Sequence, residues 1–102
     1  MIETINIKIN KVPVSRLSSV DFDNLSFGRV FSDHMFMTDY IDGEWRDFQI
    51  VPYGDLMFSP AMAAFHYGQA IFEGIKAYKQ QDGRIAVFRP IKNLERLNTS
   101  AE

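Results

Sequence analysis

Residues 39–45 of this 102-residue chain read DYIDGEW, and this stretch decides how the first half of the chain folds. The pair Asp42-Gly43 lies between two runs rich in aromatic and branched side chains, residues 30–41 and residues 45–51. Asp-Gly tolerates the positive φ angles of a tight turn, so the pair predicts a β-hairpin closed by a two-residue turn.

A second Asp-Gly pair, Asp82-Gly83, separates residues 72–79 from residues 85–88. Two glutamines precede this pair, which predicts a hairpin with a looser turn than the first. Between the two hairpins, residues 52–68 are too irregular for a long helix, although residues 60–65 are suited to a short one.

The segment before the first hairpin begins with an alternating pattern. Ile5, Ile7 and Ile9 are separated by polar residues, which is typical of a half-buried strand. Residues 11–28 are less regular and contain a proline and several serines, so we expect a long connection with room for one helical turn.

The end of the chain has the pattern of a helix. Pro90 suits a first helical turn, and Ile91, Leu94 and Leu97 recur at helical spacing. The pattern continues to Glu102 without a capping residue, which suggests a fragment of a longer protein. The predicted fold class is α+β: a mostly antiparallel sheet built from two hairpins, preceded by an N-terminal strand and followed by a C-terminal helix.

The composition excludes several classes of function. With 46% hydrophobic and 24% charged residues the chain is of ordinary globular type. The net charge is −2, and the sequence has no basic stripe that would indicate nucleic-acid binding. The chain has no cysteine, which excludes disulfides and thiolate metal sites. No apolar run approaches the roughly 20 residues of a membrane span. Without a signal-peptide pattern, we expect a cytoplasmic protein.

The densest stretch of candidate residues is 66–78, which reads HYGQAIFEGIKAY. On an extended strand, Phe72 and Lys76 share one face, and Glu73 lies on the other. The glycine between Phe72 and Lys76 leaves a gap that a ligand or another backbone can approach. From the pattern alone, a hairpin strand with a solvated lysine remains the simpler interpretation.

This stretch resembles the strand signature of the branched-chain amino-acid aminotransferases, which are pyridoxal-phosphate enzymes of fold type IV. Other stretches agree with that family in the same order: residues 27–28 (FG), 31–35 (FSDHM), 88–90 (FRP) and 93–97 (NLERL). The resemblance covers roughly residues 25–101. It implies that residues 1–102 are the N-terminal small domain of a class IV aminotransferase.

The resemblance also implies roles for individual residues. Arg96 matches the arginine that grips the cofactor phosphate, a role suited to a planar guanidinium. Phe27, Tyr67 and Phe72 match aromatic residues that wall the substrate side-chain pocket. Lys76 matches a basic residue near that pocket. The family also implies a homodimer, in which Tyr67 reaches the site of the neighbouring subunit.

Each of these residues also has a purely structural interpretation. Arg96 lies about 150° from the centre of the apolar helix stripe, so in an isolated domain it should face water. Phe27, Tyr67 and Phe72 could equally be core aromatics. The spacing alone favours these interpretations, and the family match favours the functional ones.

Three further polar residues have no partners at the spacing that chemistry needs. His34 and His66 lack a second ligand at metal spacing, so we interpret both as structural. Ser59 lacks the pattern of a partner base, which argues against a serine nucleophile.

The implied parent enzyme moves the amino group of Leu, Ile or Val to 2-oxoglutarate with pyridoxal phosphate as cofactor. The Schiff-base lysine of the family lies in a second, C-terminal domain that this chain lacks, so we expect the chain to be inactive alone. Domains of D-amino-acid aminotransferases and aminodeoxychorismate lyases are alternatives, although residues 31–35 favour the branched-chain members. A non-catalytic binding or dimerisation module is a further alternative.

Overall fold

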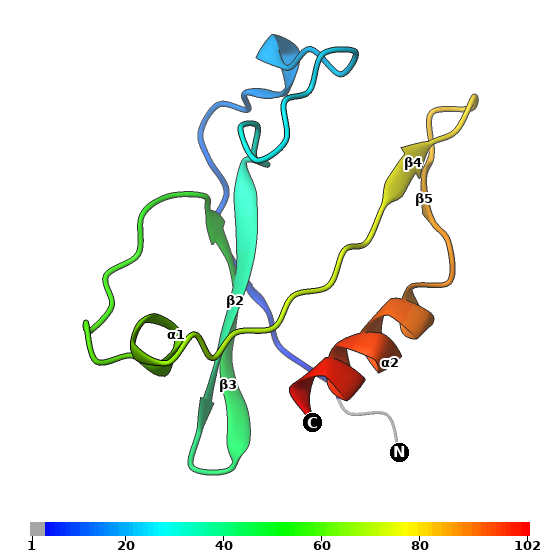
Figure 1. Ribbon diagram of the computed structural model, residues 1–102. Coiled ribbons are helices and arrows are strands. Elements are labelled where there is room, and N and C mark those ends of the chain that lie inside the picture. Colours follow the sequence, from blue (N-terminus) through cyan, green and yellow to red (C-terminus); the bar gives the residue numbers. More distant parts are fainter. Residues whose placement is uncertain (1–3) are drawn as a thin grey trace. The chain divides into compact units, whose positions relative to one another are not determined.

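A computed structural model describes residues 4–102 of the chain, which divides into two units (Figure 1). The first unit is Met1–Leu56 and the second is Met57–Glu102. The first holds a three-stranded sheet, and the second holds a two-stranded sheet and the longest helix. The predicted α+β class is therefore confirmed, with each hairpin in its own unit.

The sheet of the first unit contains β1 (Lys8–Ile9), β2 (His34–Ile41) and β3 (Glu44–Pro52) in the order β1-β3-β2. The strands β2 and β3 are antiparallel and meet at the turn Asp42-Gly43. The φ angles of these two residues are 53° and 82°, as a tight hairpin turn requires. The first hairpin is confirmed.

The ladder between β2 and β3 shifts register by one residue near its middle. Met37 pairs with Gln49, but Asp39 pairs with Arg46, so β3 carries one extra residue there. Asp47 in this bulge has a φ of 56°, which Asp tolerates better than most residues. Beyond the bulge, the ring of Trp45 packs edge-on against Tyr40 with a centroid distance of 5.0 Å.

Hydrogen bonds attach the long connection before β2 to the start of that strand. Ser15 Oγ donates to Asp33 Oδ2 at 2.5 Å, and the Arg16 amide donates to Asp33 Oδ1 at 3.1 Å. These bonds, the serine hydroxyl first, lower the pKa of the Asp33 carboxyl. The predicted helical turn in this connection is the 3₁₀ helix η1 (Leu17–Ser19).

Two expectations for the first unit need correction. The N-terminal strand has only two residues, because β1 pairs in parallel with β3 only at Gln49 and Ile50. Its isoleucines at positions 5, 7 and 9 are exposed rather than half-buried. The strand before the first turn begins at His34, not at position 30, because its ladder with β3 begins there.

The second unit contains α1 (Ala63–His66), β4 (Ala77–Lys79), β5 (Ile85–Val87) and α2 (Pro90–Ala101). The strands β4 and β5 pair in antiparallel, and Gly83 in their turn has a φ of 88°. The second hairpin is confirmed, but it is shorter than predicted. Residues 72–76 are not part of a strand, since within the described chain no neighbouring strand pairs with them.

The helix α2 begins at Pro90 as predicted, but its predicted apolar stripe is not buried. Ile91 is 60% exposed and Leu94 is 46% exposed, whereas Leu97 is half-buried. The hydrogen bonds of Asn93 and Arg96 decide which face of α2 lies against its own unit. The apolar stripe consequently remains accessible.

Neither unit encloses a hydrophobic core. Among residues 4–102 none is fully buried, and large apolar side chains are exposed throughout both units. Among the same residues, no helix is long and apolar enough to cross a membrane.

Candidate functional site

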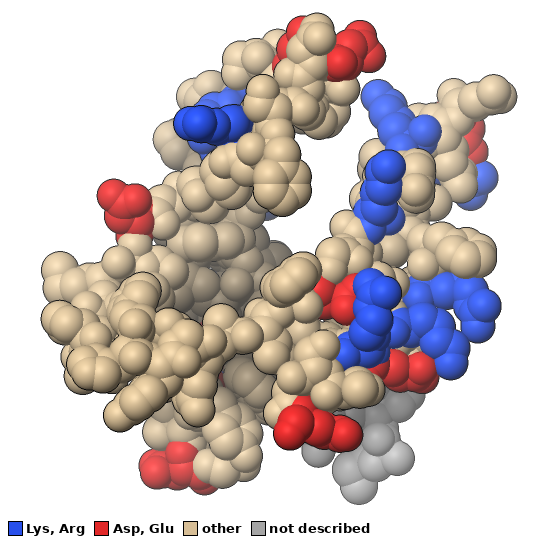
Figure 2. Space-filling view, in the orientation of Figure 1, with Lys and Arg blue, Asp and Glu red and all other residues tan. Residues whose placement is uncertain are grey.

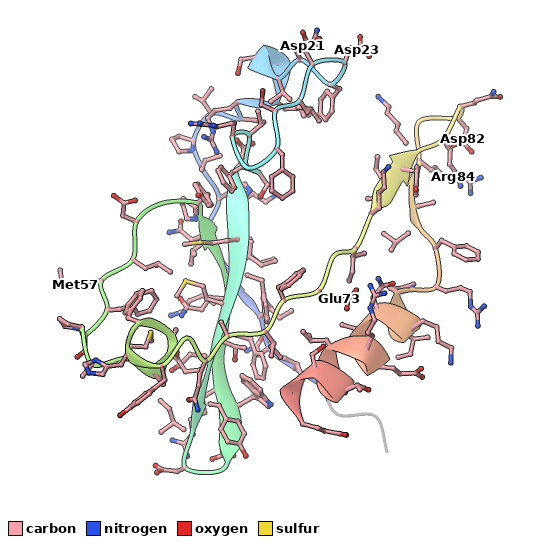
Figure 3. All side chains as sticks on the ribbon, viewed as in Figure 1. Asp21, Asp23, Met57, Glu73, Asp82 and Arg84 are labelled. Carbon is pink, nitrogen blue, oxygen red and sulfur yellow. The ribbon has the colours of Figure 1, made fainter. Side chains whose placement is uncertain are left out.

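Glu73 and Arg96 form an ion pair that joins the segment before β4 to α2 in the second unit. Arg96 Nε donates to Glu73 Oε2 at 2.8 Å, and Arg96 Nη2 donates to Glu73 Oε1. The guanidinium thus meets the carboxylate with two parallel hydrogen bonds, the geometry that gives such pairs their strength. In Figure 3, Glu73 lies beside α2, on the extended segment that leads to β4.

Asn93 adds to this contact from the preceding turn of α2. Its Nδ2 donates to Glu73 Oε1 at 3.2 Å and to the carbonyl oxygen of Gly74 at 2.8 Å. Asn93 and Arg96 are three residues apart, so they lie on the same side of the helix. Together they hold α2 against residues 73–74.

The two charged partners differ sharply in exposure. The side chain of Glu73 is only 7% exposed, while that of Arg96 is 68% exposed. Hydrogen bonding by Arg96 lowers the pKa of Glu73 from 4.5 to about 2, with a smaller contribution from Asn93. The same contact raises the pKa of Arg96. The carboxylate is therefore ionised at any physiological pH.

The exposed edge of Arg96 is suited to bind an anion. A guanidinium has five N–H donors, of which Glu73 takes two. No other hydrogen bond within the described residues uses the remaining three. Three donors in a planar, permanently charged group match the oxygens of a phosphate. Arg96 therefore fits the phosphate-binding role that the sequence resemblance implies.

The charge of the second unit agrees with an anionic ligand. This unit carries six lysines and arginines against four aspartates and glutamates, whereas the first unit is acidic. Figure 2 shows Lys and Arg side chains gathered over β4, β5 and α2. Such a cluster raises the local concentration of anions.

The other predicted site residues of the second unit are exposed. Tyr67, which follows α1, is 79% exposed, and Phe72 is 90% exposed. The ammonium group of Lys76 lies 5.3 Å from the centroid of the Tyr78 ring. Phe72 directly precedes Glu73 in the sequence, and Glu73 contacts α2 through Arg96. Among the described side chains, Tyr67 forms a ring–ring pair with His66, and no such pair with Phe72 and no cation–π pair with Lys76 is present.

Phe27 lies in the first unit, at the edge of an open hollow of about 760 Å³. Its side chain is fully exposed, and the next residue, Gly28, turns the chain with a φ of 70°. The hollow is mostly apolar; its lining includes Leu17, Val20, Phe22, Leu25, Val30 and Phe31. The core interpretation of Phe27, Tyr67 and Phe72 is wrong for the described chain, since all three are exposed.

The residues interpreted as structural make local contacts. His34 Nε2 accepts a hydrogen bond from the Val12 amide at 3.0 Å, which links the long connection to β2. His66 Nδ1 lies 3.4 Å from the carbonyl oxygen of Pro60, and Ser59 Oγ accepts from the Ala61 amide at 3.1 Å. Within residues 4–102, no cluster of potential metal ligands is present.

Sequence reasoning did not identify Glu73 or Asn93 as site residues. Alternation along a strand placed Glu73 on the face opposite Phe72, and nothing in that pattern indicated its partner. The available signal was the spacing of Asn93 and Arg96, two side chains three residues apart on one helix with hydrogen-bond donors that need an acceptor.

Comparison with known proteins gives a consistent result. No protein-family model matches the chain. Over 81 residues it is 54% identical to "Branched-chain-amino-acid aminotransferase 2" of Bacillus subtilis (strain 168), covering 78% of this chain and 22% of that protein. It is 49% identical over 83 residues to "Branched-chain-amino-acid transaminase 1" of the same strain, covering 80% of this chain and 23% of that protein.

A third relative extends the match to another genus. The "Branched-chain-amino-acid aminotransferase" of Mycolicibacterium smegmatis (strain ATCC 700084 / mc(2)155) is 47% identical over 79 residues, or 76% of this chain and 22% of that protein. The chain thus spans about a fifth of the length of these curated relatives. Over about four-fifths of its own length, it is homologous to part of them.

Proposed function

We propose that this chain is a segment of a branched-chain-amino-acid aminotransferase, and that its second unit supplies a phosphate contact for pyridoxal phosphate. The identity of 47–54% to proteins of that name supports the enzyme class. The observation that carries the cofactor contact is the guanidinium of Arg96, which Glu73 holds on one edge while the other edge is exposed.

Pyridoxal phosphate and the residues of this chain would make different contributions to the reaction. Pyridoxal phosphate, when bound, supplies the electron sink that transfer of an amino group requires. The residues of this chain contribute binding and orientation. Arg96 would hold the phosphate through its free N–H groups, and the basic surface around α2 would favour the approach of an anion.

The exposed aromatics would form part of the substrate pocket. Leu, Ile and Val have side chains without hydrogen-bonding groups, so their binding depends on apolar walls. Phe27, Tyr67 and Phe72 offer large apolar surfaces that the described chain leaves uncovered. Lys76, four residues after Phe72, adds a positive charge for the carboxylate that amino acids and 2-oxo acids share.

The remaining parts of the proposal rest on the family resemblance alone. They are transfer to 2-oxoglutarate, a second domain with the lysine that holds the cofactor, a homodimer in the cytoplasm, and a site shared between subunits through Tyr67. The names of the relatives favour the branched-chain class over D-amino-acid aminotransferases and aminodeoxychorismate lyases.

The reaction itself is tested on the complete protein that carries this chain. With pyridoxal phosphate and 2-oxoglutarate present, we expect glutamate to form when L-leucine, L-isoleucine or L-valine is supplied. Residues 1–102 alone should form none, since no lysine in them matches the family motif for the cofactor lysine. Transfer only from D-amino acids, or none at all, would contradict the proposed class.

The cofactor contact is tested by Arg96→Ala in the complete protein. Loss of charge-assisted hydrogen bonds should weaken pyridoxal phosphate binding by at least about tenfold, measured as Kd by absorbance titration. Arg84→Ala is the matched control, because Arg84 is an exposed arginine of the same unit, paired with Asp82 at 2.6 Å in the β4–β5 turn. An equal effect of both variants would remove Arg96 from the site.

A further inference from the structure

The carboxylate of Glu73 is fixed more firmly than the arginine it binds. It accepts hydrogen bonds from Arg96 Nε, Arg96 Nη2 and Asn93 Nδ2, and its side chain is almost fully covered. Asn93 also donates to the Gly74 carbonyl oxygen, which fixes the backbone beside the carboxylate. Glu73 is therefore a covered, fully hydrogen-bonded anchor beside the exposed guanidinium of Arg96.

An anchor of this kind changes what Arg96 offers to a ligand. An exposed arginine samples many rotamers, and a ligand that binds it must restrict that freedom. In this chain Glu73 already restricts it, because the paired edge of the guanidinium is held while the opposite edge is left for the ligand. Preorganisation of this kind favours ligand binding.

We propose that Glu73 is a positioning residue that orients Arg96 toward the phosphate of the cofactor, an inference that rests on the proposed function. Glu73 touches neither cofactor nor substrate in this role. It acts only through the guanidinium, with Asn93 as the second donor that keeps the carboxylate in place.

The same contact allows an opposite role for Glu73, in which it hinders phosphate binding by Arg96. A carboxylate beside Arg96 offsets its charge, so Glu73 could compete with the phosphate for the guanidinium. Competition would require the ion pair to open when the ligand binds. The three hydrogen bonds on Glu73 and its low exposure favour positioning, because the pair uses one edge of Arg96 and leaves the other.

The test uses Glu73→Gln in the complete protein, with pyridoxal phosphate and pyridoxal as probes. Pyridoxal lacks the phosphate, so an effect through Arg96 should be confined to pyridoxal phosphate. We expect the Kd for pyridoxal phosphate to rise about tenfold, while the Kd for pyridoxal stays unchanged. In an Arg96→Ala background, Glu73→Gln should have no further effect, since the two residues act as one unit.

Glu95→Gln is the matched control, because Glu95 is an exposed carboxylate on the same helix that pairs with Lys92 at 3.0 Å. It should change neither Kd. If Glu73→Gln does not fold, Glu73→Asp retains the charge but draws it back by one methylene, and it should weaken pyridoxal phosphate binding selectively.

Each other outcome has a definite meaning. An unchanged or tighter Kd for pyridoxal phosphate in the Glu73 variants would overturn the inference, and so would an equal loss for both probes or additive effects with Arg96→Ala. If the unaltered complete protein bound no pyridoxal phosphate, the proposed function itself would fail. Wild-type binding that Arg96→Ala weakens but the Glu73 variants do not would overturn only the positioning role.

Discussion

The ion pair between Glu73 and Arg96 makes the stability of the second unit depend on pH. Contact with Arg96 holds the pKa of Glu73 at about 2, below its ordinary value of 4.5. A carboxyl whose pKa is lowered in the folded state stabilises that state when it is ionised. Its contribution is therefore complete above about pH 4.5, and it is lost as the pH falls toward 2.

Glu73→Gln should remove this dependence while leaving the other carboxyls unchanged. In urea unfolding of residues 1–102, wild type should be the more stable protein at pH 6, and the difference from the variant should shrink steadily between pH 4.5 and pH 2.5. A constant difference over that range would mean that Glu73 is not ionised in contact with Arg96. Glu95→Gln serves again as the control, since it leaves the contact between Glu73 and Arg96 in place.

At the scale of elements, the turn between β2 and β3 depends on a backbone conformation that few residues adopt. Gly43 has a φ of 82°, and a Cβ added there would meet no atom within 4 Å. A side chain at this position is thus disfavoured only by its own backbone, not by any clash. Gly54 also has space for a Cβ, but its φ lies outside the left-handed region.

This pair of glycines gives a clean comparison. Gly43→Ala should destabilise residues 1–102 by about 1 kcal/mol, because alanine disfavours positive φ. Gly54→Ala should be neutral or stabilising by about 0.5 kcal/mol, since it only reduces the freedom of the unfolded chain. The free energy of unfolding from urea titration checks both values. Equal effects of the two substitutions would show that the turn conformation is not what matters.

The elements that the sequence predicted well are those set by local chemistry. The two Asp-Gly turns and the helix start at Pro90 need only the conformational preferences of a few neighbouring residues. The short β1 and the exposed stripe of α2 were missed because they depend on partners distant in sequence. Glu73 was missed for the same reason: its partner Arg96 is 23 residues away.

The family resemblance supplied Arg96 and the three aromatics, but no periodicity would have selected them. Exposed aromatics follow the same patterns as core aromatics in a sequence, because both favour strands and apolar surroundings. Only the structure distinguishes the two, since Phe72 and Tyr67 are far more exposed than core residues would be.

At the scale of the whole molecule, the absence of a buried apolar core among residues 4–102 is the dominant feature. Soluble proteins that act alone rarely expose large contiguous apolar patches, and such patches usually mark interaction surfaces. In each unit by itself, exposed apolar side chains, such as Ile9 and Ile41 of the sheet and Ile91 and Leu94 of α2, are candidates for such a surface. If the chain is a segment of a larger enzyme, the rest of that enzyme would cover them.

Residues 1–102 alone should therefore bind the dye 8-anilinonaphthalene-1-sulfonate more strongly, per mole of chain, than the complete protein does. The measurement is the increase in dye fluorescence at equal molar concentration of chain, with the oligomeric state of each sample determined and aggregates excluded by sedimentation. Equal or weaker dye binding by the short chain would indicate that its apolar surface is covered without the remainder of the enzyme.

The one extra residue in β3 has an unexpected consequence for how this sheet tolerates length changes. Side chains alternate between faces along a strand, yet Trp45 and Ile50, five residues apart, lie opposite Tyr40 and Phe36 on one face, because the bulge at Asp47 adds one residue between them. Deleting that single residue would preserve every aromatic in the sequence. With Asp47 removed, Trp45 and Ile50 would be four residues apart, the spacing of side chains that share one face of a regular strand. Trp45 would therefore stay opposite Tyr40, and the deletion would remove only the bulge.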